Sequence, residues 1–172
     1  MSVFDPLGIN VLTGRMNRWK IGDSFSGVEL TVVKKENEAR TNNILANDAH
    51  LSFTLAANEK YYFSGVVFFD TVAAADFKFR FLGPVSPALV RISRWIIVPG
   101  TGAFAGVAVE TGYSTSDLPV TGSGSIGGCM EFEGTIHNGP NSGDFNFAWA
   151  QNTTNASPTT VYAGSCIRWI KL

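Results

Sequence analysis

The sequence predicts an all-β fold, and three observations carry that prediction. Most apolar runs alternate with period two, which is typical of strands with one buried and one more exposed face. Residues 76–81 alternate three Phe with Asp76, Lys78 and Arg80, which a helix would not sort onto opposite faces. Clusters of Gly, Pro, Asn and Ser separate the runs, with the spacing expected of a sandwich, a barrel or a jelly roll.

About nine strands follow from this pattern, taken in chain order. The runs 51–55 and 145–150 repeat the alternation of 76–81, with large apolar residues on one side and small or polar ones on the other. Turn clusters at 83–84, 99–102, 121–128 and 138–143 mark where strands end. The strands are expected at 28–34, 51–55, 61–69, 76–81, 89–97, 103–110, 128–136, 145–150 and 160–170.

The domain organisation changes near residue 48. Residues 1–47 are expected to form an N-terminal arm and linker, and residues 48–172 a compact β domain. Within the first part a short helix is expected at most over 10–20, and the polar segment 36–47 is predicted to be a loop.

Composition and charge exclude several classes of function. The 172 residues suit one domain with a net charge of -1, and only 16% are charged. Between Arg94 and Arg168 there is no Lys or Arg but there are five acidic residues, the wrong sign for a surface that binds nucleic acid. No apolar run approaches the ~18 residues of a membrane span, and no secretory signal is visible, so we expect the chain to be made and kept in a cytoplasm, at least initially. Such a low share of charged residues suggests that other protein covers much of the surface.

Residues able to carry catalysis are few. Gly122-Ser-Gly-Ser-Ile-Gly127 matches a dinucleotide-binding fingerprint, but an alternating strand follows it, so it is interpreted as a loop between strands. A triad base or a metal site would have to use His50 or His137, and neither has supporting spacing. Glu131 and Glu133 share one face of a strand and are interpreted as a wet sheet face rather than as a glycosidase pair. The sequence therefore predicts no enzyme activity, no metal and no cofactor.

The two cysteines and two of the aromatic groups carry open alternatives. Cys129 and Cys166 lack the spacing of a metal or redox motif and are expected to pack as small hydrophobes, with a disulfide as the alternative. Trp149 has small neighbours, so both faces of its strand are expected to be buried, as in a contact between subunits. Trp19, flanked by basic residues, suits either a docking anchor or packing against its own sheet.

Two stretches resemble a β domain of tailed-bacteriophage virion proteins. They contain ARTN at 39–42, LSFTLAA at 51–57, AADFKFRF at 74–81, FAWAQN at 147–152, TTV at 159–161 and AGS at 163–165. Such domains occur in capsid decoration proteins, head fibres and tail fibres. The resemblance implies a jelly roll similar to the tumour necrosis factor and C1q type, usually a trimer and without a catalytic motif. The chain departs from the pattern at Cys166, where an aromatic residue is expected, and over 1–38, which have no counterpart.

We therefore expect a non-enzymatic phage structural protein, a capsid decoration or cement protein that forms homotrimers on the capsid exterior. Its partners would be itself and the major capsid protein or another virion protein, with neither nucleic acid nor membrane. The alternative is a head-fibre or tail-fibre tip that binds a host receptor or glycan. The residues expected at the trimer interface are Phe145, Phe147, Trp149 and Gln151, and those expected to attach to the capsid are Phe4, Leu7, Ile9, Arg15, Arg18 and Trp19.

Overall fold

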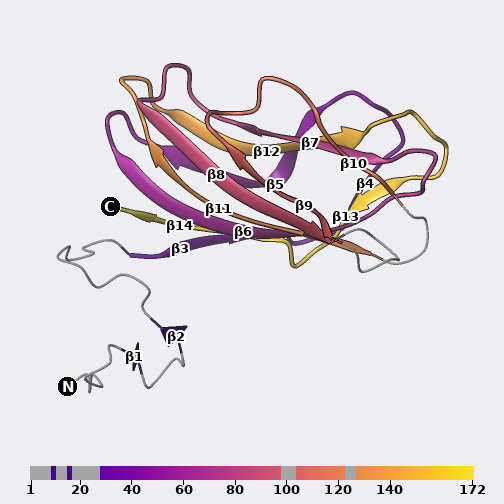
Figure 1. Cartoon of the computed structure of the whole chain (residues 1–172), viewed down its shortest axis with the longest axis horizontal. Coiled ribbons are helices and arrows are strands. Elements are labelled where there is room, and N and C mark those ends of the chain that lie inside the picture. The colour runs from indigo at the N-terminus through magenta and orange to yellow at the C-terminus, as the bar shows by residue number, and fades with distance from the viewer. Residues whose placement is uncertain (1–8, 11–14, 17–27, 98–103, 123–126) are drawn as a thin grey trace.

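The computed structural model describes residues 9–10, 15–16, 28–97, 104–122 and 127–172, and every regular element within them is a strand. Figure 1 shows the two packed sheets that these strands form. The strands are β1 (Ile9–Asn10), β2 (Arg15–Met16), β3 (Leu30–Val33), β4 (Glu38–Arg40), β5 (Ala46–Leu55), β6 (Lys60–Asp70), β7 (Phe77–Leu82), β8 (Leu89–Ile97), β9 (Phe104–Glu110), β10 (Leu118–Val120), β11 (Gly128–His137), β12 (Gly143–Gln151), β13 (Thr159–Val161) and β14 (Cys166–Lys171).

The eight strands from β5 to β12 form a jelly roll. They pair from the outside inward, β5 with β12, β6 with β11, β7 with β10 and β8 with β9, and every pair is antiparallel. This is the pairing of one long hairpin that has been folded over into two sheets. The smaller sheet has the order β10-β7-β12-β5, and the larger one contains β6, β11, β8 and β9. The predicted all-β jelly-roll sandwich is therefore confirmed.

Four further strands extend the larger sheet beyond β6. β14 pairs with β6 and β3 pairs with β14, while β13 pairs with both β6 and β4. Since β3 and β4 belong to residues predicted as arm and linker, the β domain begins near residue 28 instead of residue 48. The chain needs these strands because they cover the side of the sandwich at which the jelly roll would otherwise expose the edge of β6.

Side chains from both sheets meet in one aromatic core. Phe77, Phe79 and Phe81 of β7 are fully buried, as their alternation with charged residues predicts. Phe53 of β5 stacks on Trp169 of β14, with 4.7 Å between ring centroids, and so joins the two sheets. Aromatic pairs of this kind stabilise a core beyond the area that they bury.

Three local expectations need correction. Asn10, Arg15 and Met16 are in strands, so the helix expected over 10–20 does not form at those positions. The segment 36–47 contains β4 and the start of β5 instead of forming only a loop. The single strand expected over 160–170 is two strands, because Gly164 adopts a φ of 88° and turns the chain between them.

Candidate functional site

The residues expected at a trimer interface lie inside the chain's own core. Phe145, Phe147, Trp149 and Gln151 of β12 each have no exposed surface. Their side chains therefore have nothing to offer a partner subunit, which corrects the prediction that they line the contact between copies.

The other side of β12 is also covered by the chain itself. Ala148 and Ala150 are fully buried on the outer side of the strand, opposite Arg80 and Lys78 of β7 in the register. The register thus sets each alanine beside a basic residue of the neighbouring strand. The expectation that both faces of this strand are buried is thus met within one chain, without a second subunit.

Most residues expected to attach to a capsid lie outside the described residues. This applies to Phe4, Leu7, Arg18 and Trp19. Ile9 lies on β1 opposite Met16, and Arg15 lies on β2 opposite Asn10, so only the backbone of these two positions is placed. Attachment through this segment stays a prediction.

The residues weighed for catalysis are dispersed. His50 lies on β5 and His137 at the end of β11, in different sheets. Glu131 and Glu133 do share the outer face of β11, where each accepts a hydrogen bond from a neutral donor, Trp95 Nε1 at 3.1 Å and Tyr62 Oη at 2.8 Å respectively. Among the described residues no group of three His, Cys, Asp or Glu is placed to hold a metal ion, and no helix is long and apolar enough to cross a membrane.

The segment that matches a dinucleotide fingerprint connects two strands. It runs from β10, which ends at Val120, to β11, which begins at Gly128. A side chain added at Gly122 would lie 2.7 Å from the carbonyl oxygens of Thr71 and Val72, so this glycine allows a close backbone approach. A strand, not a helix N-terminus, follows the motif, so the loop interpretation is confirmed at its described ends.

A buried network of charges ties the two sheets together, and sequence reasoning missed it. Lys34 follows β3 and donates from Nζ to Glu38 of β4 at 2.8 Å and to Asp48 of β5 at 2.7 Å. The side chains of Lys34 and Asp48 are fully buried. Arg40 donates to Glu38 as well, and its guanidinium lies 4.0 Å from the ring centroid of Trp149. Two cations and two anions therefore neutralise one another between β3, β4, β5 and β12.

Backbone and ring donors complete the partners of Asp48. Its Oδ1 accepts from the amides of His50 and Leu51 at 2.9 and 3.1 Å, and its Oδ2 accepts from Trp149 Nε1 at 3.0 Å. Burial by itself raises the pKa of Glu38, but hydrogen bonds from Lys34 and Arg40 and their charges outweigh it and lower this pKa to about 2. The network has its polar atoms satisfied internally, so it serves the fold rather than a reaction.

The outer face of the smaller sheet is polar and makes its own contacts. Lys78 and Arg80 both pair with Asp117, at 2.9 and 2.7 Å, and Thr54 donates to Asp144 at 2.8 Å. The hydrogen bond from Lys78 is the main cause that lowers the pKa of Asp117, despite a smaller opposing effect of burial. Charges that are paired within one chain suit a face in contact with water.

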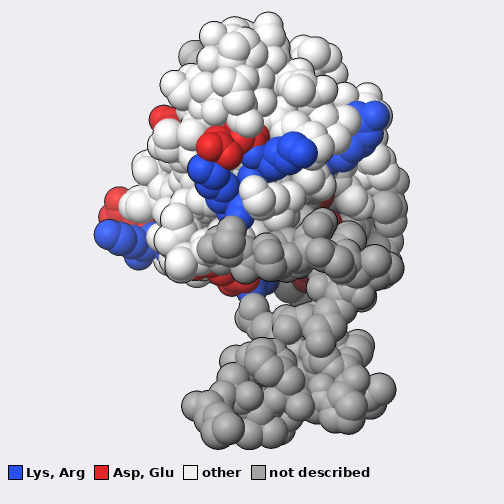
Figure 2. Space-filling view, turned by 90° about the vertical axis from the view of Figure 1, so that its left-hand side faces the viewer, with Lys and Arg blue, Asp and Glu red and all other residues white. Residues whose placement is uncertain are grey.

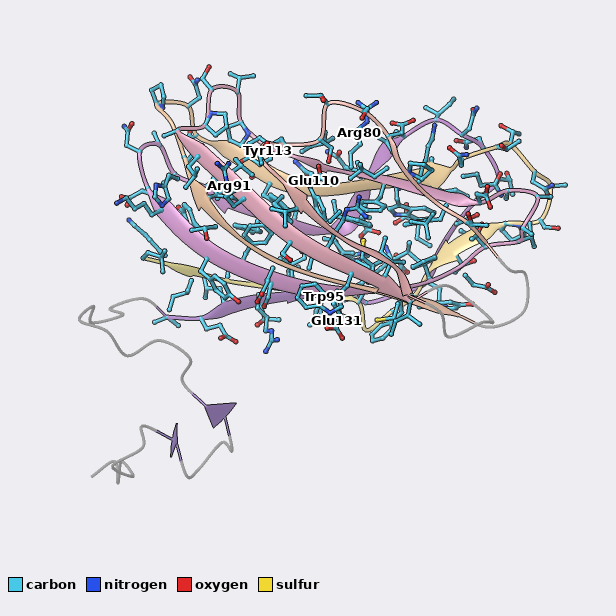
Figure 3. The ribbon with its side chains drawn as sticks, in the orientation of Figure 1. Arg80, Arg91, Trp95, Glu110, Tyr113 and Glu131 are labelled. Carbon is cyan, nitrogen blue, oxygen red and sulfur yellow. The ribbon has the colours of Figure 1, made fainter. Side chains whose placement is uncertain are left out.

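The outer face of the larger sheet is different, because a band of apolar side chains crosses it. We call this set the apolar band, and it consists of Val33 of β3, Cys166 of β14, Val66 and Phe68 of β6, Cys129 of β11, and Trp95 and Ile97 of β8. Val33, Phe68 and Ile97 are 47%, 41% and 37% exposed, and the other four are half-buried. In Figure 3 the labelled Trp95 and Glu131 lie together on this side of the sandwich.

The register places the members of the apolar band side by side. Cys129 lies opposite both Phe68 and Ile97, and Cys166 lies opposite both Val66 and Val33. The sequence carried a signal for this surface, because residues 66–69 are apolar at successive positions, which leaves large side chains on both faces of β6. The two cysteines are free thiols, and both lie in this band.

A hollow of about 260 Å³, lined by both polar and apolar residues, lies on the same outer face, next to the apolar band. Arg91 and Ser93 of β8, Glu133 and Thr135 of β11, and Tyr62 of β6 line it. Glu133 accepts a hydrogen bond from Tyr62, whereas Arg91, among the described residues, donates to the carbonyls of Val90 and Thr111 at 2.9 and 3.5 Å. The hollow thus has an acidic and a basic wall with no ion pair between them among the described residues.

Few charges interrupt the surface. The side that Figure 2 presents is mostly uncharged, with basic and acidic side chains gathered in small groups. This agrees with the low share of charged residues in the sequence.

Comparison with known proteins yields distant likenesses in structure alone. No family model matches the chain, and no curated protein matches it in sequence. A structure of the Gt strain of infectious bursal disease virus is 10% identical with a TM-score of 0.23, and covers 88% of this chain and 43% of that one. A VP2 subviral particle of the same virus is 10% identical with a TM-score of 0.24, over 88% and 42%. The chain spans less than half of the length of those chains, and the strand order rather than this likeness defines the fold.

Proposed function

We propose that this chain is a non-enzymatic structural protein of a virion, which forms homotrimers and decorates the exterior of a capsid. The observation that carries the proposal is the contrast between the two outer faces of a complete jelly roll. One face pairs its own charges, and the other leaves an apolar band exposed. A surface of that kind is typical of a protein that functions in an assembly.

The sequence supports the virion setting. Its resemblance to tailed-phage virion proteins covers motifs that the structure places on β5, β7 and β12, three of the four strands of the smaller sheet. The low share of charged residues also suits a chain whose surface is largely covered by neighbours.

Attachment is assigned to the N-terminal segment. Residues 1–27 precede the β domain and carry Phe4, Leu7, Ile9 and Trp19 among basic residues, more apolar surface than a free tail keeps in water. Three copies of such a segment in one trimer would add their affinities for a capsid through avidity.

The experiment mixes purified chain with capsid shells that lack it and measures occupancy by sedimentation and imaging. Trp19→Ala should weaken binding by about 2 kcal/mol per arm if Trp19 is a hot spot. Leu172→Ala, at the far end of the chain, is the matched control and should bind like the wild type. Unchanged occupancy of Trp19→Ala, together with unchanged occupancy after deletion of residues 1–25, would contradict attachment through this segment. Failure of the wild-type chain to bind any shell, with binding to host cells instead, would favour a fibre tip.

A further inference from the structure

We propose that the apolar band is the surface through which copies of this chain contact one another. The inference rests on the proposed function, because it assumes an assembled protein, and it names the face and the partner that the assembly uses. The contact between subunits, which the sequence analysis assigned to β12, is here assigned to strands of the larger sheet.

The apolar band is continuous around Glu131. This residue lies between Trp95 and Val66 in the register, but Ile97, Cys129 and Phe68 lie side by side and connect the two parts of the band. Its members are the outward neighbours of core residues, as Val66 is of Val67, Phe68 of Phe69 and Cys129 of Met130. They extend over five adjacent strands, β3, β14, β6, β11 and β8. At about 4.8 Å between strands the band is roughly 20 Å across. Apolar side chains that are contiguous over such a width have the anatomy of an interface core.

Polar groups border the band, as they do at the rim of an interface. Ser93 precedes Trp95 by two residues on the outer face of β8, and Glu133 follows Glu131 by two residues on the outer face of β11. Ser64 of β6 and Arg168 of β14 continue this row, since Glu133 lies opposite Ser64 and Ser64 lies opposite Arg168. A core of apolar side chains beside a row of polar ones is the usual arrangement at contacts between subunits.

The charges on this face indicate that the partner is a second copy of the chain. Among the described residues, Glu131 and Glu133 accept hydrogen bonds from neutral donors, and Arg91 donates to backbone carbonyls. The described ion pair of Arg168 is a long one, at 3.9 Å from Glu29. A surface that presents both signs without pairing them is complementary to itself. A nucleic acid or an acidic lipid surface is a disfavoured partner, because its negative charges would be repelled by Glu131 and Glu133.

The opposite face is a poor competitor. Lys78 and Arg80 on that face already pair with Asp117, and its small residues Ala148 and Ala150 are buried within the chain. Burying those ion pairs against a partner would remove water from charges that gain nothing new in return. On the larger sheet, association therefore buries more apolar surface for each polar group that is removed from water.

The test places a charge within the band and measures the mass of the full-length chain. Phe68→Arg is suited to it, because a side chain that is 41% exposed can be replaced without opening the core. Thr54→Arg, on the exposed side of β5 in the smaller sheet, is the matched control. By light scattering at micromolar concentration, the wild type and Thr54→Arg should have three times the 18.5 kDa mass of the chain, and Phe68→Arg should have the mass of one chain. Circular dichroism should show the same strand content in all three.

A second readout uses the native thiols of the band. Alkylation of Cys129 and Cys166 should be at least tenfold faster in Phe68→Arg than in the wild type, since association covers both thiols in the wild type. If Phe68→Arg keeps the wild-type mass and alkylation rate, the band is not the contact surface, although capsid binding by the N-terminal segment is untouched by that result. If the wild type itself has the mass of one chain, both this assignment and the trimer in the proposed function are wrong.

Discussion

Lys34 and Asp48 form an ion pair in which both side chains are fully buried, with 2.7 Å between Nζ and Oδ2. The two residues come from different sheets, since Lys34 follows β3 of the larger sheet and Asp48 lies on β5 of the smaller one. The pair therefore joins the added strands to the jelly roll. A buried pair adds little stability relative to apolar residues, but the loss of one partner leaves an uncompensated charge.

The first prediction follows from the unequal surroundings of these two residues. Asp48→Ala should lower the free energy of unfolding by about 3–5 kcal/mol, because it leaves a buried ammonium and removes the acceptor of two backbone amides and the Trp149 ring. Lys34→Met should lower the free energy of unfolding by less, since Asp48 still accepts hydrogen bonds from the two backbone amides and the Trp149 ring. Denaturant unfolding measures both. Lys171→Met is the control, because its 2.7 Å pair with Glu59 is exposed and should contribute less than about 1 kcal/mol. Equal costs for Asp48→Ala and Lys171→Met would contradict the role of the buried pair.

The second prediction concerns the pH dependence of stability through Glu38. The pKa of Glu38 is about 2 in the folded chain, below its ordinary value of 4.5. A lowered folded pKa means that the stabilisation is complete above pH 4.5 and is lost as the pH falls from 4.5 towards 2. Its size is on the order of 2 kcal/mol for this partly exposed side chain. Glu38→Gln should therefore be less stable than the wild type at pH 6, and the difference should nearly vanish at pH 2. A difference that is constant over this range would contradict it.

The sequence predicts the strands whose alternation reflects burial directly. Phe77, Phe79 and Phe81 all face the core, and β8 has the predicted bounds. The sequence could not predict that β4 belongs to the sheet. Glu38 and Arg40 have the composition of a solvated loop, and only the fold brings Lys34 and Asp48 beside them to neutralise their charges.

The candidate site was misplaced for a similar reason. Aromatic and small residues alternate in 145–150, a pattern that fits a strand buried between subunits. The sequence does not reveal the register with β7, which sets Lys78 and Arg80 beside the alanines, and these are buried within one chain. The apolar band draws single residues from five strands, so no local pattern contains it, although the run of apolar residues at 66–69 is its trace in the sequence.

The third prediction tests the packing of a turn at one end of the sandwich. A Cβ at Gly139 would lie 2.0 Å from the carbonyl oxygen of Ser86, a backbone atom that cannot move aside alone. The carbonyl oxygen of Gly139 also accepts a hydrogen bond from the amide of Asn58 at 2.8 Å, which fixes the position of Gly139. Gly139→Ala should lower the free energy of unfolding by about 1–3 kcal/mol. Gly112→Ala is the control, since a Cβ there meets nothing within 4 Å and should change stability by less than about 1 kcal/mol. Thermal or denaturant unfolding of the two variants decides, and equal stability would contradict the clash.

The fourth prediction concerns the reactivity of Cys129 in the apolar band. Burial is the main cause that raises the pKa of this thiol, and the charge of Glu131 raises it further. Because alkylation proceeds through the thiolate, the rate should rise with pH to a midpoint above the ordinary value for a thiol. Glu131→Gln removes the smaller cause, so this midpoint should move down while staying above the ordinary value.

The measurement follows iodoacetamide labelling by mass across pH 7–10 in a Cys166→Ala background, in which Cys129 is the one remaining thiol. Comparing midpoints instead of absolute rates separates the pKa from coverage by a partner, and Asp144→Asn, in the other sheet, is the control for a general change in charge. A midpoint that Glu131→Gln leaves unchanged, or moves no more than Asp144→Asn does, would show that Glu131 does not act on the thiol.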